Sequence, residues 1–196
     1  MQSSAQRPLG ARGPRSRVVR LWPLPPLWRR LLPQELHFVA RHFGPEQADW
    51  LARHVRLGVR RLGDRRRALS LNGGWISLPR ACYAGQALAG TLCLSQPGVA
   101  GLFAHELLHA LQRRQGLAVT RPSLWLQCRM LLTQHDPYAY ARCDRSSSLL
   151  RQFWGAQVEQ QAQMWQDHVS ALVAGRPLAS HRGVALAVRA GRLRRR

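Results

Sequence analysis

Apolar residues recur at helical spacing in four stretches of the chain, which predicts four helices. The first covers residues 33–44, and the second covers 45–63 and opens at a proline, which is favoured at the first position of a helix. The third covers residues 97–114, with Gly116 as its stop, and the last covers about 148–174.

The pattern changes from helical to alternating between the second and third helices. The apolar runs 69–71 and 76–78 flank the sequence Asn72-Gly73-Gly74, which is typical of a tight turn between antiparallel strands. We therefore predict a β-hairpin here, and an α+β fold class that is mostly helical with a small sheet. Residues 117–148 show no clear period apart from a short apolar piece at 122–132.

The net charge of +21 at pH 7 is concentrated at the two ends of the chain, and all 30 basic residues are arginine. Residues 1–33 and 176–196 hold seven arginines each and no acidic residue, which leaves 16 arginines against nine acidic residues, a balance of +7, in residues 34–175. We predict a flexible Arg- and Pro-rich leader at 1–30, one folded domain at 31–175 and a flexible Arg-rich tail at 176–196.

Composition also narrows the classes of protein. No stretch approaches 18 uninterrupted apolar residues, so no transmembrane helix is predicted. The apolar segment 21–28 is too short and too rich in proline for a signal peptide. The four cysteines are widely spaced without a CxxC pair, which is unlike a zinc finger or a disulfide framework. The arginine-rich ends could bind nucleic acid or an anionic surface without sequence preference.

The third predicted helix carries the sequence HELLH at residues 105–109. Because His105 and His109 are four residues apart, both imidazoles project from one face and can bind a single metal ion. Glu106 is offset around the helix, which places its carboxylate beside a metal-bound water as a general base. With eight His residues in the chain, chance would produce this pattern in only about 1% of such sequences. The alternative is a pair of hydrogen-bonded core histidines.

A catalytic zinc site usually has three protein ligands, so a further ligand is expected downstream. Glu159 is favoured, because it lies beside the apolar stripe of the last predicted helix, and His168 is the alternative. Asp167 could orient a histidine ligand. Tyr138 and Tyr140 are the phenols available to stabilise an oxyanion, and we prefer Tyr140 for this catalytic role. The hydroxyl groups of both could equally face solvent beside packed rings.

The sequences LFAHELLHALQ, DPYAY and VEQQAQMWQDH, in this order, resemble a group of bacterial zincin-like proteins that accompany Rhs and Vgr components of type VI secretion systems. The earlier sequences LLPQELHFVARHFG and ALSLNGGWISLPRACY are also similar, so the resemblance covers about residues 31–175. It implies a zincin-like metallopeptidase with an HExxH helix, a small sheet and a later helix that carries a ligand. In many peptidases with a glutamate ligand that helix reads ExxxD, but Gln163 stands at the Asp position here.

The sequence therefore predicts a Zn²⁺-dependent peptidase with His105, His109 and Glu159 as metal ligands and Glu106 and Tyr140 as catalytic residues. Its partners would be a peptide or protein substrate and secretion-system proteins. Two alternatives stay open: an inactive zincin-like interaction module of a secretion system, and a basic protein associated with nucleic acid. The expected location is the bacterial cytoplasm, with export by a route independent of a signal peptide as the further alternative.

Overall fold

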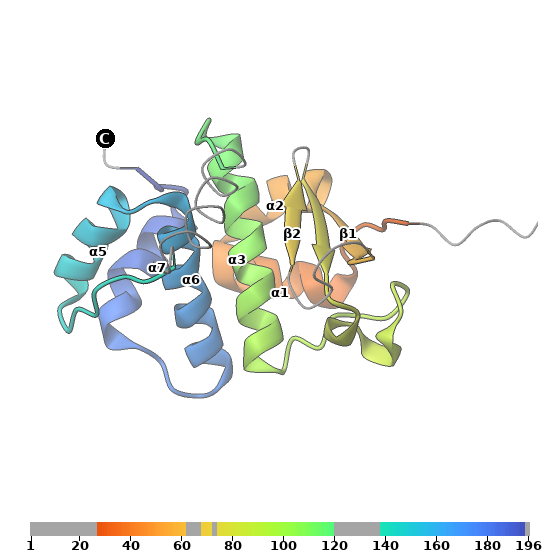
Figure 1. Cartoon of the computed structure of the whole chain (residues 1–196). Helices are drawn as coiled ribbons and strands as arrows, with labels where there is room; N and C mark the ends of the chain where they lie inside the picture. Colours follow the sequence, from red (N-terminus) through yellow and green to blue (C-terminus); the bar gives the residue numbers. More distant parts are fainter. Residues whose placement is uncertain (1–26, 62–67, 72–73, 120–137, 195–196) are drawn as a thin grey trace, which may run out of the picture.

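The computed structural model describes residues 27–61, 68–71, 74–119 and 138–194. Helix α3 (Pro97–Arg114) lies between a small sheet with two helices on one side and a layer of three helices on the other (Figure 1). The first group consists of α1 (Pro33–Phe43), α2 (Pro45–His54), β1 (Arg56–Val59), β2 (Leu69–Leu71) and β3 (Trp75–Leu78), and the second of α5 (Ser146–Gly155), α6 (Val158–Val173) and α7 (Arg182–Arg189). Three short 3₁₀ turns complete the described part: η1 (Arg80–Cys82), η2 (Ala84–Gln86) and η3 (Ala179–His181). The predicted α+β class, mostly helical, is confirmed.

The sheet has the strand order β1-β3-β2. Strand β2 is antiparallel to β3, with Ser70 opposite Ile76, which confirms the predicted hairpin pairing; the turn itself at residues 72–73 lies outside the described residues. Strand β1 is parallel to β3, and Arg29 forms a bridge with Leu57 on its other side. Strand β2 therefore forms the edge of the sheet that packs against α3.

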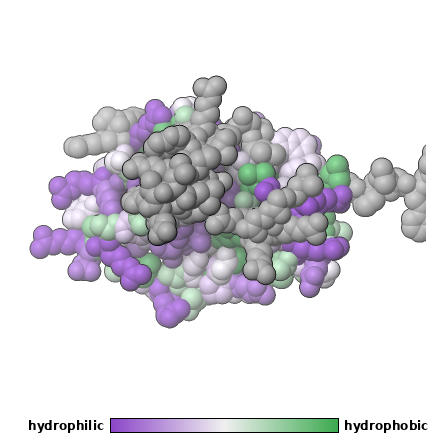
Figure 2. Space-filling model, in the orientation of Figure 1, coloured by the Kyte–Doolittle hydropathy of each residue, from purple (hydrophilic) through white to green (hydrophobic). Residues whose placement is uncertain are grey.

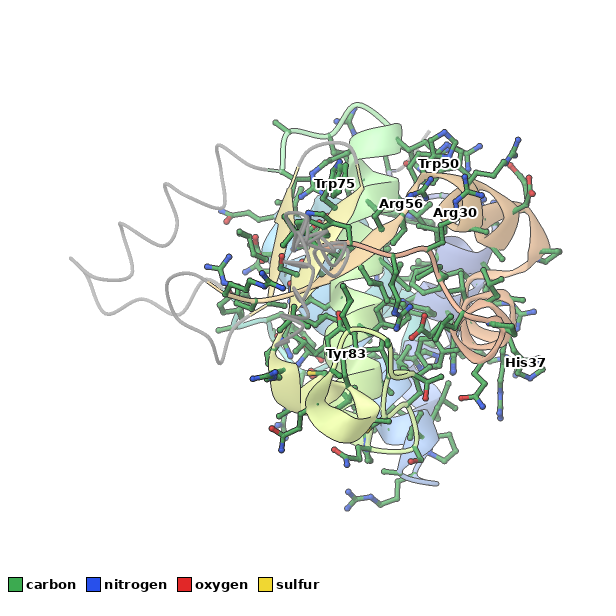
Figure 3. All side chains as sticks on the ribbon, turned by 90° about the vertical axis from the view of Figure 1, so that its right-hand side faces the viewer. Arg30, His37, Trp50, Arg56, Trp75 and Tyr83 are labelled. Atoms are coloured by element: carbon green, nitrogen blue, oxygen red, sulfur yellow. The ribbon has the colours of Figure 1, made fainter. Side chains whose placement is uncertain are left out.

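The second helix, predicted over residues 45–63, is wrong in its second half. Helix α2 ends at His54, and residues 56–59 form strand β1 instead. Val55 and Leu57 are fully buried, and β1 finds hydrogen-bonding partners on both sides. Gly58 lets the ring of Trp28 cover the strand, since a Cβ atom there would lie 2.5 Å from that ring. Figure 3 shows this side of the molecule, with Trp75 at one end of the sheet and Tyr83 nearer the other. The near-helical spacing of apolar residues in this segment therefore predicted a helix where the chain forms a buried strand.

Two further predictions at the C-terminal end are wrong. The long helix expected at 148–174 is divided into α5 and α6 by a break after Gly155. The expected flexible tail contains α7, and Val184 and Val188 of this helix are fully buried in the core, as is Leu193 just after it. The arginines at the two ends of α7, Arg182 and Arg189, are exposed, so the amphipathic helix buries its apolar side while these guanidinium groups stay in solvent.

The folded domain also begins before residue 31. Both terminal nitrogens of Arg29 bind the Glu35 carboxylate, at 2.7 and 2.6 Å, and Glu35 is fully buried. The same carboxylate accepts hydrogen bonds from the backbone N–H groups of Leu32 and Leu92. Because this buried charge pair is satisfied on all sides, it fixes the chain before α1 to the segment before α3. The rest of the predicted leader, residues 1–26, lies outside the described residues.

Helices α3 and α6 make the main contact of the core. Gly101 allows their close approach, because a Cβ atom there would overlap with the Ser170 side chain and lie 3.0 Å from the Gln166 carbonyl oxygen. Phe103 and Trp165 are fully buried in the same core. In the described part of the face in Figure 2, apolar areas are small and separated by hydrophilic side chains. No helix among the described residues is long and apolar enough to cross a membrane.

Candidate metal centre

Two helices bring the three predicted metal ligands together. His105 and His109 project from the middle of α3, and Glu159 lies in the first turn of α6. All three residues are buried, and their ligand atoms lie within 4.8 Å of one another. The break before α6 is what allows this position, because the helix starts afresh beside α3 instead of continuing from α5.

The distances within this cluster fit a tetrahedral ion. The Nε2 atoms of His105 and His109 are 3.1 Å apart, and they lie 3.4 and 3.3 Å from the same oxygen of Glu159. Ligands at about 2.0–2.2 Å from a tetrahedral zinc are separated from each other by about 3.3–3.6 Å. Two facing imidazole nitrogens and a carboxylate oxygen at this spacing therefore match the donor set and size of a zinc site.

The tautomer of His109 is fixed by Gln112, one turn further along α3. The Nδ1–H group of His109 donates to the Gln112 amide oxygen at 2.7 Å, so Nε2 keeps its lone pair for a metal. The Gln112 amide nitrogen in turn donates to Gln161 at 2.9 Å and to the Val158 carbonyl at 3.1 Å. Gln161 is anchored through its own NH₂ group, which donates to the carbonyls of Phe153 and Leu193. This chain of amides, which we call the glutamine latch, runs from the candidate ligand His109 to the end of α5 and to Leu193 after α7.

Replacing Gln112 with Ala is expected to weaken zinc binding about 10–100-fold, the usual effect of removing a group that orients a ligand. Gln112→Glu restores an acceptor for His109 and is expected to bind zinc more tightly than Gln112→Ala. Competition with a chromophoric chelator measures both affinities. Gln115→Ala, six residues or nearly two turns beyond His109, is the matched control. Equal affinity of Gln112→Ala and wild type would show that the latch does not support the site.

His105 has no comparable support among the described residues. Its Nδ1 atom is buried and has no hydrogen-bond partner there. Asp167, which the sequence offered as a candidate to orient a histidine ligand, accepts from Tyr140 at 2.6 Å and from Gln163 at 2.8 Å. Gln163 thus binds Asp167 in the next turn of the same helix. Gln163, at the position where the ExxxD pattern has Asp, therefore forms a hydrogen bond with neither candidate histidine ligand within the described part of the chain.

Tyr140 lies with Asp167 and not with the metal ligands. Its hydroxyl is bonded to Asp167, eight residues or about 12 Å along α6 from Glu159, and lies 3.2 Å from His181 Nε2. Burial and then the hydrogen bond to Asp167 raise the pKa of Tyr140. The preferred oxyanion donor of the sequence analysis is thus held elsewhere by a strong acceptor. The ring of Tyr138, the other candidate, lies 6.1 Å from that of His105.

His168, the alternative ligand, belongs to a separate group of buried histidines. Its ring stacks on His181 at 6.1 Å between centroids and on Trp165 at 5.1 Å. Desolvation and then the neighbouring His181 and His42 lower the pKa of His168 to about 4. The geometry therefore favours Glu159 over His168 as the third ligand. His135 and Asp136, whose side chains are also of metal-binding types, lie outside the described residues.

The electrostatics of the centre are set by two carboxylates. Burial acts to lower the pKa of His109, but the hydrogen bond and charge of Glu159, the charge of Glu106 and the Gln112 bond outweigh it and raise that pKa. Since zinc displaces this proton, metal affinity should rise with pH. Glu106 is itself buried, on the side of α3 about 100° round from His105. Its charge acts on His109 and on Arg113, which lies one turn beyond His109.

A cavity of about 690 Å³ lies elsewhere on the molecule. It is lined by α1, the segment 91–96 and the end of α6, and it includes His37, Arg41 and His42. None of the three ligands of the centre lines it. The cavity is therefore separate from the chemistry proposed below.

Comparison of the chain with protein-family models, curated proteins and solved structures gives no significant match. The class of the protein follows from the fold and the site alone: an α+β protein with a buried His-His-Glu group that could hold a metal ion. Sequence reasoning found these three residues but did not assign roles to Gln112, Gln161 and Arg113. Of these, Gln112 could have been found, because a residue three positions after a helical ligand lies beside it.

Proposed function

We propose that the protein is a zinc-dependent peptidase. The observation that carries this proposal is the spacing of His105, His109 and Glu159, whose ligand atoms are separated by 3.1, 3.4 and 3.3 Å, within about 0.2 Å of the edge lengths of a zinc tetrahedron. Three protein ligands leave room for a fourth position, as catalytic zinc sites require and structural sites with four protein ligands do not. The hydrogen bond from His109 to Gln112, which orients the imidazole ring with Nε2 toward the other two residues, supports the same assignment.

When bound, zinc would supply Lewis acidity, which polarises a carbonyl group and makes a nearby water acidic enough to lose a proton near neutral pH. Glu106 is the residue that accepts this proton and passes it to the leaving amine. It follows His105 directly on α3, so its carboxylate lies next to the ligands without joining them. The glutamine latch holds the His109 ring in place during the reaction.

The motif EQQA gains a physical meaning under this proposal. Glu159 supplies a ligand, Gln160 closes the start of α6 by accepting from the Gln157 backbone N–H, and Gln161 completes the latch. Ala162 is fully buried in the core. Three of these four residues thus build the site or the start of the helix that carries it, which supports a relationship to the secretion-associated zincin-like group. A secreted effector that cleaves protein is the activity we infer on this ground.

Glu106→Gln is the variant that tests catalysis. It is expected to keep one zinc per chain and to lose at least about 10²-fold in peptide hydrolysis, because a general base contributes about 10²–10⁴-fold. The measurement is cleavage of a mixed peptide library by the zinc-loaded protein, followed by mass spectrometry. Glu46→Gln, on the exposed side of α2, is the matched control. Equal cleavage by Glu106→Gln and wild type would remove Glu106 from the mechanism.

A second candidate function is a metal-binding module that does not cleave. Two observations favour it: the buried Nδ1 atom of His105 has no hydrogen-bond partner in the part of the chain that the structure describes, and the Tyr140 hydroxyl is bonded to Asp167. Zinc binding without cleavage of any peptide in the library would establish this alternative.

A further inference from the structure

Arg113 lies in line with Glu106 on α3. The two residues are seven positions apart, which corresponds to two turns, about 10 Å along the axis and a difference of only about 20° around it. His105, His109 and Arg113 also follow one another at intervals of four residues. Arg113 therefore belongs to the side of the helix that carries the ligands and the proposed general base.

The guanidinium group of Arg113 has no carboxylate partner among the described residues. One terminal nitrogen donates to the Ser70 hydroxyl at 2.7 Å, and the other donates to the Ser70 carbonyl oxygen at 2.8 Å. The Nε atom is buried and has no acceptor within residues 27–61, 68–71, 74–119 and 138–194. A half-buried cation with an unused buried donor is costly to maintain for packing alone.

The carboxylates of Glu106 and Glu159 act on Arg113 through their charge, and neither forms an ion pair with it among the described residues. Burial lowers the pKa of Arg113, and the charges of Glu106 and Glu159 act in the opposite direction. When Glu159 binds a metal, its negative charge is neutralised and less of it remains to balance Arg113. A bound metal would thus strengthen the attraction of this group for another anion.

Arg113 also touches the strand that an extended peptide would join. Strand β2 is the edge of the described sheet, and its Ser70 carbonyl accepts a hydrogen bond from Arg113 on α3. An edge strand offers its backbone groups to a peptide in extended conformation. A peptide that lies along β2 and over this side of α3 would run past Glu106 and reach the guanidinium group, because both residues lie on that side of the helix.

We propose that Arg113 determines specificity by binding a carboxylate of the substrate about three residues from the bond that is cut. This inference rests on the proposed peptidase function and names its substrate class, which is acidic peptides. The spacing follows from the 10 Å between Glu106 and Arg113 and the rise of about 3.3 Å per residue in an extended chain. A carboxylate can accept hydrogen bonds from Nε and a terminal nitrogen together.

The charge of the chain agrees with this substrate class. The net charge is +21, and the balance stays at +7 in residues 34–175. Such a surface raises the local concentration of acidic polypeptides. Arg113 adds the local, directional contact that a diffuse positive charge does not provide.

The test uses peptide hydroxamates, which bind zinc through the hydroxamate group, on the zinc-loaded full chain. Matched pairs carry Asp or Asn at the second, third or fourth residue from the hydroxamate, which is placed at either the N- or the C-terminal end. Calorimetry gives each dissociation constant. The expected result is binding at least about tenfold tighter for Asp than for Asn, greatest at the third residue in one of the two series.

Arg113→Gln is expected to lose this preference, and Arg113→Lys to keep part of it. Arg114→Gln removes the same charge one residue further on, where the guanidinium stacks on Trp50 and binds Gln47, and should keep the full preference. Ser70→Ala removes one hydrogen bond of Arg113 but keeps the cation, and should also keep it. This variant separates substrate binding from a purely structural link between α3 and β2.

Equal affinity of the wild type for Asp and Asn peptides would overturn the role of Arg113 and leave the peptidase proposal intact. Equal losses in Arg114→Gln and Arg113→Gln would overturn it as well, because general charge would then explain the preference. Failure of every hydroxamate to bind a protein that holds zinc would instead count against the peptidase function itself.

Discussion

Replacing Glu159 with Ala is expected to lower zinc affinity by at least about 10³-fold. A direct ligand contributes more than the 10–100-fold that residues behind the ligands contribute, and its loss leaves two imidazoles that cannot hold a catalytic zinc on their own. Glu159→Gln should lose nearly as much, because the neutral amide lacks the charge that attracts the ion. Chelator competition at pH 7.5 measures these affinities.

His168→Gln is the control for this prediction, because His168 was the competing ligand in the sequence. It lies nine residues further along α6, in the histidine group with His181. We expect its zinc affinity to match that of wild type. Loss of zinc in His168→Gln with retention in Glu159→Ala would mean that the ligand set assigned to the centre is wrong.

Acidification from pH 7.5 to pH 5 is expected to destabilise the fold by several kcal/mol through buried histidines. The pKa of His42 is lowered to about 4 by burial and then by Arg41 and Arg189. The pKa of His168 is lowered to about 4 by burial and then by His181 and His42. His181 has a lowered pKa for the same reason of burial, against the opposing charge of Asp167.

The direction of this change in stability follows from the number of protons that the folded and the unfolded chain bind. Between about pH 6.5 and pH 4 the unfolded chain protonates these histidines and the folded chain does not, so the free energy of unfolding falls as pH falls. Each of His42 and His168 should contribute about 2 kcal/mol of this loss at pH 5. Urea unfolding with a chelator present, at pH 7.5 and pH 5, measures it.

The matched comparison for the pH effect is between His168→Leu and His54→Gln. His54 is exposed and stacks on Trp50, so its substitution should leave the pH dependence unchanged. His168→Leu should reduce it by about 2 kcal/mol, because the protonation that favours the unfolded chain is removed. Identical pH dependence in all three proteins would refute the assignment to the histidine group.

Local patterns predicted much of this fold. Helix α3 was found because proline, glycine and apolar spacing agree over 18 residues. Strand β1 was missed because Val55 and Val59 also fit a helical period, and only pairing with β3 decides between the two. The prediction of a flexible tail was wrong because its seven arginines, without an acidic residue, indicated a solvated segment, whereas α7 has a buried apolar side.

In the candidate site too, the residues placed by local spacing were predicted and the contacts between distant segments were not. His105 and His109 follow from spacing within one helix, and Glu159 followed from its place beside an apolar stripe. The bonds from Gln112 to Gln161 and from Arg113 to Ser70 span 49 and 43 residues. No sequence pattern reports such contacts, because they depend on how α3 meets α6 and β2. The position of Tyr140 was misjudged for the same reason, since Asp167 competes for its hydroxyl.

Whether the His-His-Glu group binds zinc is decided by measuring the zinc content of the purified full chain and the X-ray absorption spectrum of the bound zinc. One zinc per chain is expected, bound by two imidazole nitrogens and by oxygen ligands, and lost in His105→Ala. Absence of zinc after supplementation, or a zinc with sulfur ligands that persists in His105→Ala, would contradict this expectation.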